Sequence, residues 1–288
     1  MQLAQFTSGN GPRVGLVQGE SLVDLTSRFD VTDMLELMAR WDALQATLQA
    51  IREHEQDFAL AKVRLLAPVT RPGKIFAIGL NYADHCQEAR LAVPEHQTWF
   101  TKAGSSINGP FDSIERPAVS EQLDYEAELV AIIGHRCRNV PKARAQEVVF
   151  GYCVGNDVSV RDWQLLTTQW CLGKSFDHAA PIGPWITTAD AVNPHSLGIR
   201  SFVNGQKRQS SNTRHLVFNV FDMVAYLSQA MTLEPGDVIF TGTPMGVGLH
   251  FPGGPVFLKP GDVVRVEIDR LGAIENRVEA GSGEPMIS

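Results

Sequence analysis

The chain has 288 residues, of which 44% are hydrophobic and 20% are charged, and its formal net charge is −7. This composition is that of an ordinary globular protein with one large domain or two small ones. The negative charge and the lack of any lysine and arginine block argue against nucleic acid as a partner, and no run approaches 18 apolar residues, which argues against a membrane span.

Residues 1–70 are predicted to form a small α/β domain. Glycine-rich turns separate three short β-prone segments, at Met1–Phe6, Arg13–Val17 and Ser21–Asp24. Thr32 is placed to cap a helix that begins near Asp33, and residues 41–53 carry apolar side chains at helical spacing. The segment 65–72 contains two prolines, which disfavour both helix and interior strand, so we interpret it as a linker.

Residues 71–288 are predicted to form a second, larger domain. From Gly73 onwards, many short β-prone segments are separated by glycine and proline turns. Pro-Gly-Asp turns precede strands expected at Val238–Thr241 and Val263–Asp269, and Leu271 with the glycine after it marks a hairpin. We therefore predict an α+β protein whose larger domain is a mixed, mostly antiparallel β-roll or barrel-like sandwich with a few peripheral helices.

The cysteines and the N-terminal residues indicate in which cell compartment the protein is expected. The chain has four cysteines, and no two of them form a Cys-x-x-Cys pair: Cys86, Cys137, Cys153 and Cys171. They are typical of reduced, mostly buried thiols in a cytoplasmic protein, not of a zinc site or a disulfide frame. The N-terminus also lacks a basic stretch followed by an apolar one, so no secretory signal is expected.

Three carboxylates stand out in apolar surroundings. Glu126 and Glu128 lie in a β-prone run, and Asp157 follows in another. Residues two apart on a strand share a face at roughly 7 Å, so the two glutamates project together. Buried like charges are costly unless a cation compensates them, and an all-oxygen set suits Mg²⁺ or Mn²⁺ better than zinc or copper. From this pair alone, a strand end with two solvated glutamates is an equal alternative.

A histidine and a glutamate form a second candidate pair. The chain is expected to run from a strand at Ile75–Ile78 into a short helix, which places His85 and Glu88 on one face. A carboxylate that binds one imidazole nitrogen fixes the tautomer and raises the basicity of the other nitrogen, so the pair can deprotonate a water. At this spacing alone, the two residues are otherwise ordinary surface neighbours.

Six motifs in a fixed order resemble one known family. They are Gly79-Leu-Asn-Tyr-x-x-His85-x-x-Glu88, Tyr125-Glu-x-Glu-Leu129, Gly155-Asn-Asp-Val-Ser-x-Arg161-Asp, Gly173-Lys-Ser-Phe-Asp177, Pro181-Ile-Gly-Pro184 and Thr241-Gly-Thr-Pro-x-Gly-Val-Gly248. Together they resemble the fumarylacetoacetate hydrolase (FAH) family, closest to its acylpyruvate-hydrolase-like branch, over residues 72–281. The resemblance implies a mixed β-roll and a homodimer.

The resemblance also implies roles for individual residues. Three acidic positions match the family's ligands for Mg²⁺ (or Mn²⁺): Glu126, Glu128 and Asp157. Three positions match catalytic residues, of which the first two lie on a mobile helical lid: His85, Glu88 and Lys174. Three more match positions that help to hold an anionic substrate: Arg161, Lys102 and Thr243.

The implied activity is that of a metal-dependent hydrolase acting on a small keto acid. It would cleave a carbon–carbon bond in a 2,4-diketo acid, either an acylpyruvate or a diketo-deoxy sugar acid, with water activated by His85 and Glu88. The alternatives are an oxaloacetate-type decarboxylase or an isomerase on the same magnesium site, because fold and metal ligands alone do not separate these reactions. A non-catalytic keto-acid binder is a third alternative, and the acyl group of the substrate is left open.

Overall fold

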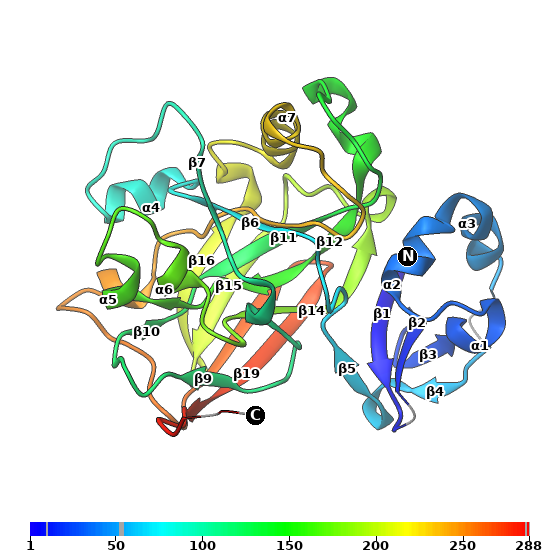
Figure 1. Cartoon of the computed structure of the whole chain (residues 1–288), viewed down its shortest axis with the longest axis horizontal. Coiled ribbons are helices and arrows are strands. Elements are labelled where there is room, and N and C mark those ends of the chain that lie inside the picture. Colours follow the sequence, from blue (N-terminus) through cyan, green and yellow to red (C-terminus); the bar gives the residue numbers. More distant parts are fainter. Residues whose placement is uncertain (10, 52–54, 286, 288) are drawn as a thin grey trace.

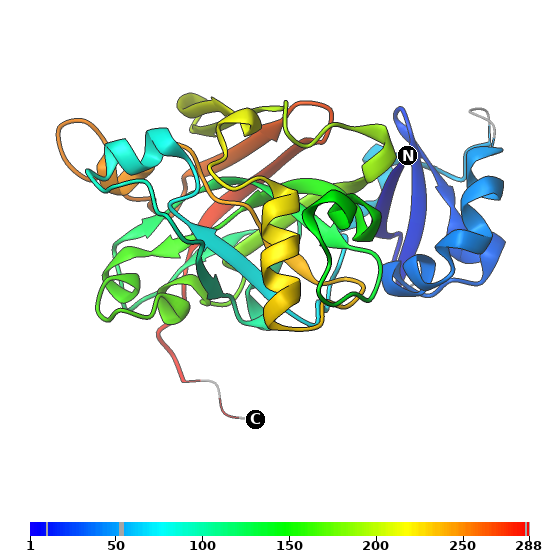
Figure 2. The ribbon, with the colours of Figure 1, turned by 90° about the horizontal axis from the view of Figure 1, so that it is seen from above.

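The computed structural model describes residues 1–9, 11–51, 55–285 and 287. Its fold is α+β, as expected, with a small N-terminal part at one end of the long axis and a larger β-rich part beside it (Figure 1, Figure 2). Within the described residues, no helix is long and apolar enough to cross a membrane.

The N-terminal part is a small sheet covered by short helices. Its elements are β1 (Gln2–Thr7), β2 (Pro12–Gln18), β3 (Ser21–Asp24), α1 (Leu25–Phe29), α2 (Met34–Ala39), α3 (Trp41–Gln49), β4 (Phe58–Ala59) and β5 (Arg64–Leu66). The three expected strands are therefore confirmed. Leu3, Leu16, Met34, Leu37 and Leu48 bury the apolar faces of sheet and helices in one shared core, which is why these short helices are stable here.

Three details of this part differ from expectation. Asp33, not Thr32, caps α2, because its carboxylate accepts from the backbone N–H of Glu36 at 2.9 Å. The Thr32 hydroxyl instead donates to the Glu36 carboxylate. Helix α3 ends at Gln49, and residues 52 and 53 of the expected helix lie outside the described residues. The linker prediction was wrong at its start, where β5 pairs with β1.

The larger part contains the remaining elements. These are β6 (Ile75–Gly79), α4 (Ala83–Glu88), β7 (Thr98–Thr101), β8 (Ile107–Asn108), β9 (Ile114–Arg116), β10 (Leu123–Asp124), β11 (Ala127–Ile133), β12 (Val149–Asn156), β13 (Ser159–Val160), α5 (Arg161–Gln164), α6 (Cys171–Lys174), β14 (Ala180–Thr188), β15 (Gly198–Val203), β16 (Gln206–Asn212), α7 (Val220–Ala230), β17 (Val238–Phe240), β18 (Val263–Ile268) and β19 (Gly272–Ala280). Short 3₁₀ helices lie between them, at Leu60–Lys62 (η1, in the N-terminal part), Gly104–Ser106 (η2), Lys142–Val148 (η3), Ala189–Ala191 (η4), Thr213–His215 (η5) and Gly248–His250 (η6).

Two sheets enclose the main core. One follows the order β1-β14-β12-β11-β17-β6-β7 and is antiparallel except where β17 pairs with β6. The other follows the order β16-β15-β18-β19-β9, with β18 and β19 joined by the expected hairpin at Leu271. Leu129, Val154, Ile199 and Val266 meet between the sheets and are fully buried. This arrangement is the mixed β-roll that the sequence predicts.

The strand β1 links the two parts. It pairs with β14 in the larger part as well as with β2 and β5, so one sheet continues from one part into the other. The division of the chain at residues 70 and 71 stays a prediction. Helices α4, α5 and α6 gather at the end of the larger part that lies away from the N-terminal part (Figure 1), and they carry His85, Arg161 and Lys174 of the candidate site.

Candidate active site

The register of two strands brings the three acidic residues together. In the antiparallel pair β11–β12, Ala127 lies opposite Asn156, so the residues just outside this pair, Glu126 and Asp157, are neighbours. The backbone N–H of Asp157 donates to the Glu126 carbonyl at 2.9 Å. One carboxylate oxygen from each of Glu126, Glu128 and Asp157 lies within 4.8 Å of the others, and all three residues are buried. We call this set the acidic triad.

Two members of the triad have cationic partners. The Lys174 ammonium lies 2.7 Å from Glu126 Oε2 and 2.7 Å from Asp157 Oδ2. Arg161 Nη1 lies 2.7 Å from Glu126 Oε1, and the Lys102 ammonium lies 2.7 Å from Asp157 Oδ1. Although burial opposes ionisation, Lys174 and Arg161 lower the pKa of Glu126 to about 2. Glu126 is therefore held as a carboxylate.

Glu128 lacks such a partner. Its Oε2 accepts from the backbone N–H of Gly242 at 2.6 Å, and no lysine, arginine or histidine of the described ranges forms an ion pair with it. Burial, and then the neighbouring charges of Asp157 and Glu126, raise the pKa of Glu128 well above its usual value. A divalent cation among the three carboxylates would supply the missing charge, and this all-oxygen donor set fits Mg²⁺ or Mn²⁺.

Helix α4 presents the histidine–glutamate pair. His85 Nδ1 lies 3.1 Å from Glu88 Oε2, and both side chains are largely buried. Glu88 Oε1 accepts from the backbone N–H of Gly246 at 2.9 Å, which ties the helix to the loop that follows β17. Because Nδ1 is engaged by Glu88, Nε2 is the ring nitrogen that can exchange a proton with a substrate.

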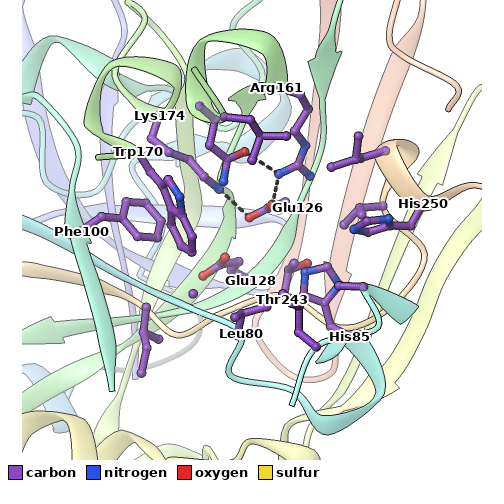
Figure 3. A pocket seen from close by; sticks show the side chains of 18 residues that line it. Leu80, His85, Phe100, Glu126, Glu128, Arg161, Trp170, Lys174, Thr243 and His250 are labelled. Carbon is purple, nitrogen blue, oxygen red and sulfur yellow. Dashed lines mark hydrogen bonds and ion pairs between the residues drawn. The ribbon is translucent and has the colours of Figure 1, made fainter. Parts of the chain in front are cut away.

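A cavity of about 130 Å³ joins these groups. Phe100 and Trp170 lie on one side of Glu126, and His85 and His250 lie on the other side (Figure 3). Most of the remaining wall is apolar, with contributions from Ile78, Leu80, Ala89, Leu91, Leu165, Val247 and Leu249. The site therefore combines charged groups at the triad with a confined and mainly apolar wall, which strengthens electrostatic interactions inside it.

Two family models match this chain, and together they cover most of its length. A family model described as fumarylacetoacetate (FAA) hydrolase C-terminal matches residues 74–279. The chain belongs to the FAH family. A second model, described as Rv2993c-like, N-terminal, matches residues 1–68. The resemblance found in the sequence motifs is thus confirmed, and the chain is a FAH-family enzyme.

Curated FAH-family relatives match almost the whole chain. Oxaloacetate tautomerase fahd2, mitochondrial, of Xenopus laevis is 45% identical over 96% of this chain and 90% of its own. Oxaloacetate tautomerase FAHD2A, mitochondrial, of Homo sapiens is 42% identical over 96% and 91%. The names of these relatives place those proteins in mitochondria, so the cytoplasmic location of this chain stays a prediction.

Solved FAH-family structures match as fully. Maleylpyruvate hydrolase from Sphingobium sp. SYK-6, in complex with manganese(II) ion and pyruvate, has a TM-score of 0.83 and 37% identity and covers 98% of this chain and 100% of its own. 5-Carboxymethyl-2-hydroxymuconate delta-isomerase from Mycobacterium smegmatis has a TM-score of 0.77 and 35% identity, with the same coverage. Relatives thus include tautomerases, a hydrolase and an isomerase, while the expected homodimer stays a prediction.

The three expected substrate-binding residues are placed differently from one another. Arg161 lines the cavity, but its guanidinium is already held between Asp124 and Glu126. Thr243 also lines it, yet its hydroxyl donates to the Ala127 carbonyl at 2.9 Å. Lys102 is not on the wall, because it lies behind the triad against Asp157. We therefore assign Lys102 to charge balance and propose no substrate contact for it.

Lys174 is on the wall, where the sequence places it. Burial opposes its charge, but Asp157 and Glu126 raise the pKa of Lys174, so it remains an ammonium at neutral pH. Its ammonium also lies 5.0 Å from the centre of the Phe100 ring. This environment favours Lys174 as a donor that stabilises negative charge and argues against a role as a general base.

Other wall residues escaped the sequence analysis. Trp170 lines the cavity, whereas Trp99 packs against the core, beside Phe76. Gln164 and His250 carry polar groups on the wall and were not anticipated. The available signal for His250 was its position two residues after the glycine-rich loop that ends at Gly248.

Proposed function

We propose that this protein is a metal-dependent enzyme that interconverts the keto and enol forms of a short 2-keto acid, with oxaloacetate as the leading substrate. The observation that carries the proposal is that His85, held by Glu88, lies on the wall of a small cavity that Glu126 and Glu128 of the acidic triad also line. The tautomerase names of relatives that are 42–45% identical support the choice of oxaloacetate.

The volume of the cavity favours a compact substrate. An engineered protein cavity of about 150 Å³ accommodates benzene, which has six non-hydrogen atoms. The 130 Å³ cavity is of that order, so a four-carbon keto acid fits better than a long-chain one. The groups on the wall, acidic triad aside, are mostly apolar, and they exclude bulk water from a bound substrate.

The charges around the triad favour an anionic substrate once a metal is present. The cluster contains four carboxylates, Asp124, Glu126, Glu128 and Asp157, and three cations, Lys102, Arg161 and Lys174. When all are ionised, the cluster has one net negative charge, and a divalent cation would make it one net positive. Such a cluster attracts a carboxylate.

The residues suit proton transfer at the carbon next to the keto group. A divalent cation bound at the triad would act as a Lewis acid that polarises the 2-keto oxygen. His85 Nε2 takes a proton from C3, the C3–H electrons form the C2=C3 double bond, the carbonyl π electrons move onto the 2-keto oxygen, and the same nitrogen returns the proton to that oxygen to give the enol. Glu88 holds the ring in the required tautomer, and the Lys174 ammonium offsets the negative charge that develops.

Hydrolysis of a 2,4-diketo acid is the second candidate. The same His85–Glu88 pair can remove a proton from water, and the solved maleylpyruvate hydrolase is 37% identical to this chain. In that reaction, hydroxide adds to the 4-carbonyl and the C3–C4 bond breaks, which leaves pyruvate and a carboxylic acid. Both candidates use the same base and the same stabilisation of a developing enolate.

The test uses protein freed of metal with a chelator and then reloaded with Mg²⁺ or Mn²⁺. Oxaloacetate is added as a pure tautomer, and its conversion is followed by ultraviolet absorbance, with pyruvate measured in parallel to detect decarboxylation. We expect conversion faster than in buffer, lost with chelator and restored by metal. Maleylpyruvate and acetylpyruvate are then assayed for cleavage products. If reloaded protein accelerates none of these reactions, the proposal is wrong.

A further inference from the structure

His250 is a polar group on the cavity wall that the proposed reaction does not use. It ends the short helix η6, and its ring centre lies 6.1 Å from that of His85. Figure 3 shows both rings on the side of Glu126 that faces away from Trp170. The ring of His250 forms no hydrogen bond or ion pair with residues 1–9, 11–51, 55–285 or 287. Its nitrogens are therefore available to a ligand.

Asp124 fixes the backbone that carries His250. Its Oδ1 accepts from the N–H of Gly248 at 2.8 Å, and its Oδ2 accepts from the N–H of Leu249 at 2.9 Å. A Cβ on Gly248 would lie 2.6 Å from Asp124 Oδ1, so this approach requires glycine. Asp124 is fully buried, which makes these bonds hard to replace by water. His250 is thus held in place and does not belong to a free loop.

The same carboxylate connects His250 to the triad. Arg161 Nε donates to Asp124 Oδ2 at 2.8 Å, and Arg161 Nη1 binds Glu126. A continuous chain of short contacts therefore runs from Glu126 through Arg161 and Asp124 to the residues before His250. Because Arg161, Asp124 and Glu126 are buried, the fold sets the distance between the triad and the imidazole, as selection of a substrate by its length requires.

The chemistry of the His250 ring suits a carboxylate oxygen as its partner. Burial lowers the pKa of His250, and the charge of Glu88 offsets this only in part, so the ring is neutral near pH 7 and offers one N–H donor. The opposite wall offers aromatic rings, and the triad end holds the cluster of charges. On the histidine side, an anionic group at the far end of a short substrate meets the ring of His250, whose nitrogens have no partner among the described residues.

We propose that His250 is a specificity-determining residue that donates a hydrogen bond to the carboxylate of the substrate farthest from the acidic triad. The site then selects dicarboxylic acids over analogues with an alkyl group at that end. This inference rests on the proposed function for the orientation of the substrate. A hydrogen bond to a charged group contributes about 1.5–3 kcal/mol, so its loss weakens binding about 10- to 100-fold.

The experiment compares two unreactive ligands. Malate and 2-hydroxybutanoate differ only in that a methyl group replaces the distal carboxylate of malate. Their dissociation constants are measured by calorimetry on Mg²⁺-loaded wild type, His250→Leu and His250→Gln. We expect His250→Leu to lose about 10- to 100-fold in affinity for malate, with 2-hydroxybutanoate unchanged. His250→Gln, which keeps a donor, should retain most of the malate affinity.

Several results would overturn the inference. One is that wild type binds both ligands with equal affinity, and another is that wild type does not bind malate. A third is that His250→Leu loses the same factor in affinity for both ligands. Thermal unfolding with and without Mg²⁺ checks that each variant keeps the wild-type fold and metal response. Binding is measured without turnover, so the two proposals can fail separately. If His250→Leu loses affinity for malate alone but wild type does not turn over oxaloacetate, only the proposed function is refuted. Turnover with unchanged malate binding in His250→Leu would refute the role of His250 alone.

Discussion

The side chains of Glu126 and Glu128, at the start of β11, point to the same side of the strand, yet Glu126 has cationic partners and Glu128 has none among the described residues. Glu126 receives Lys174 and Arg161 at 2.7 Å each. Among the residues that the structure describes, Glu128 accepts a single hydrogen bond, from the backbone N–H of Gly242. The two positions therefore make opposite contributions to the stability of the metal-free protein, although both belong to the same triad.

Neutralising Glu128 should stabilise the metal-free protein. The pKa of Glu128 in the folded protein lies above its unfolded value near 4.3. The folded protein therefore loses stability as the pH rises above 4.3, because ionised Glu128 is less stable in the fold than in water. Glu128→Gln in chelator at pH 7 should unfold at an equal or higher denaturant concentration than wild type. Mg²⁺ at 100 times its dissociation constant should stabilise wild type by about 2.7 kcal/mol and leave Glu128→Gln unchanged.

The matched variant Glu126→Gln should behave in the opposite way in chelator. The folded pKa of Glu126 is about 2, so the charge stabilises the fold above the unfolded pKa and this contribution disappears as the pH falls toward 2. Removing the Glu126 carboxylate leaves the buried Lys174 and Arg161 side chains with one anionic partner fewer, which lowers the free energy of unfolding by about 3–5 kcal/mol. Equal destabilisation of both variants in chelator at pH 7 would contradict this account of the triad.

Loss of the His85 base should reduce turnover with little effect on metal binding. His85→Ala should lower kcat by about 10²- to 10⁴-fold, the range for general-base catalysis. Glu88→Gln can keep the bond from the Gly246 N–H but presents an amide to His85 Nδ1, which favours the tautomer with a proton on Nε2. It should therefore also lose kcat, with KM nearly unchanged. Steady-state kinetics with Mg²⁺ affinity as the control checks both variants, and wild-type turnover in His85→Ala would exclude the proposed base.

The parts of the site that the sequence could predict depend on short-range spacing. Glu126 and Glu128 are two apart on a strand and His85 and Glu88 are three apart on a helix, so local geometry alone brings each pair together. The balance of charge around them could not be predicted in this way. Lys102 meets Asp157 across 55 residues of sequence, and that contact exists only after the sheets have formed.

The same reasoning explains the fold. Strands at both ends of the chain follow from alternating apolar residues and turn signals, and they were placed within a few residues. The pairing of β1 with β14 joins residues more than 180 positions apart, and no local pattern specifies that partner. Trp170 illustrates the same limit for a side chain, because an aromatic residue in a core and one on a cavity wall have the same sequence signal.

Asp24 should give the N-terminal part a pH-dependent stability. Burial opposes its ionisation, but Arg13 and the Ser27 backbone N–H, which it caps, lower the pKa of Asp24. Its contribution is therefore present above the unfolded pKa near 3.9 and is lost as the pH falls through the lower folded value. Asp24→Asn keeps an oxygen that can cap α1 but loses the charge that pairs with Arg13, so it should lose about 0.2–1 kcal/mol at pH 7 and less at pH 3. Chemical unfolding at both pH values checks this, with exposed Glu20→Gln as the neutral control.

A methyl group at Gly79 should disturb the aromatic wall of the cavity. Gly79 ends β6, and a Cβ there would lie 2.3 Å from Cζ3 of Trp170. Trp170 would have to move, either into the cavity or away from Phe100, with which it forms an edge-to-face contact at 5.5 Å. Gly79→Ala should cost about 1–3 kcal/mol in stability. KM should rise on the order of tenfold, with a smaller effect on kcat because the change lies across the cavity from His85.

A double-mutant cycle separates this clash from a general effect of the substitution. Trp170→Phe removes the ring atoms that the new methyl group would meet, so the double variant Gly79→Ala/Trp170→Phe should be more stable than the sum of the single changes predicts. Gly104→Ala is the matched control, because a Cβ there meets nothing within 4 Å, and its KM should equal that of wild type. Additive effects of the two changes on both stability and KM would mean that Trp170 does not form the wall at this position, and the cavity would then have a different shape from the one described.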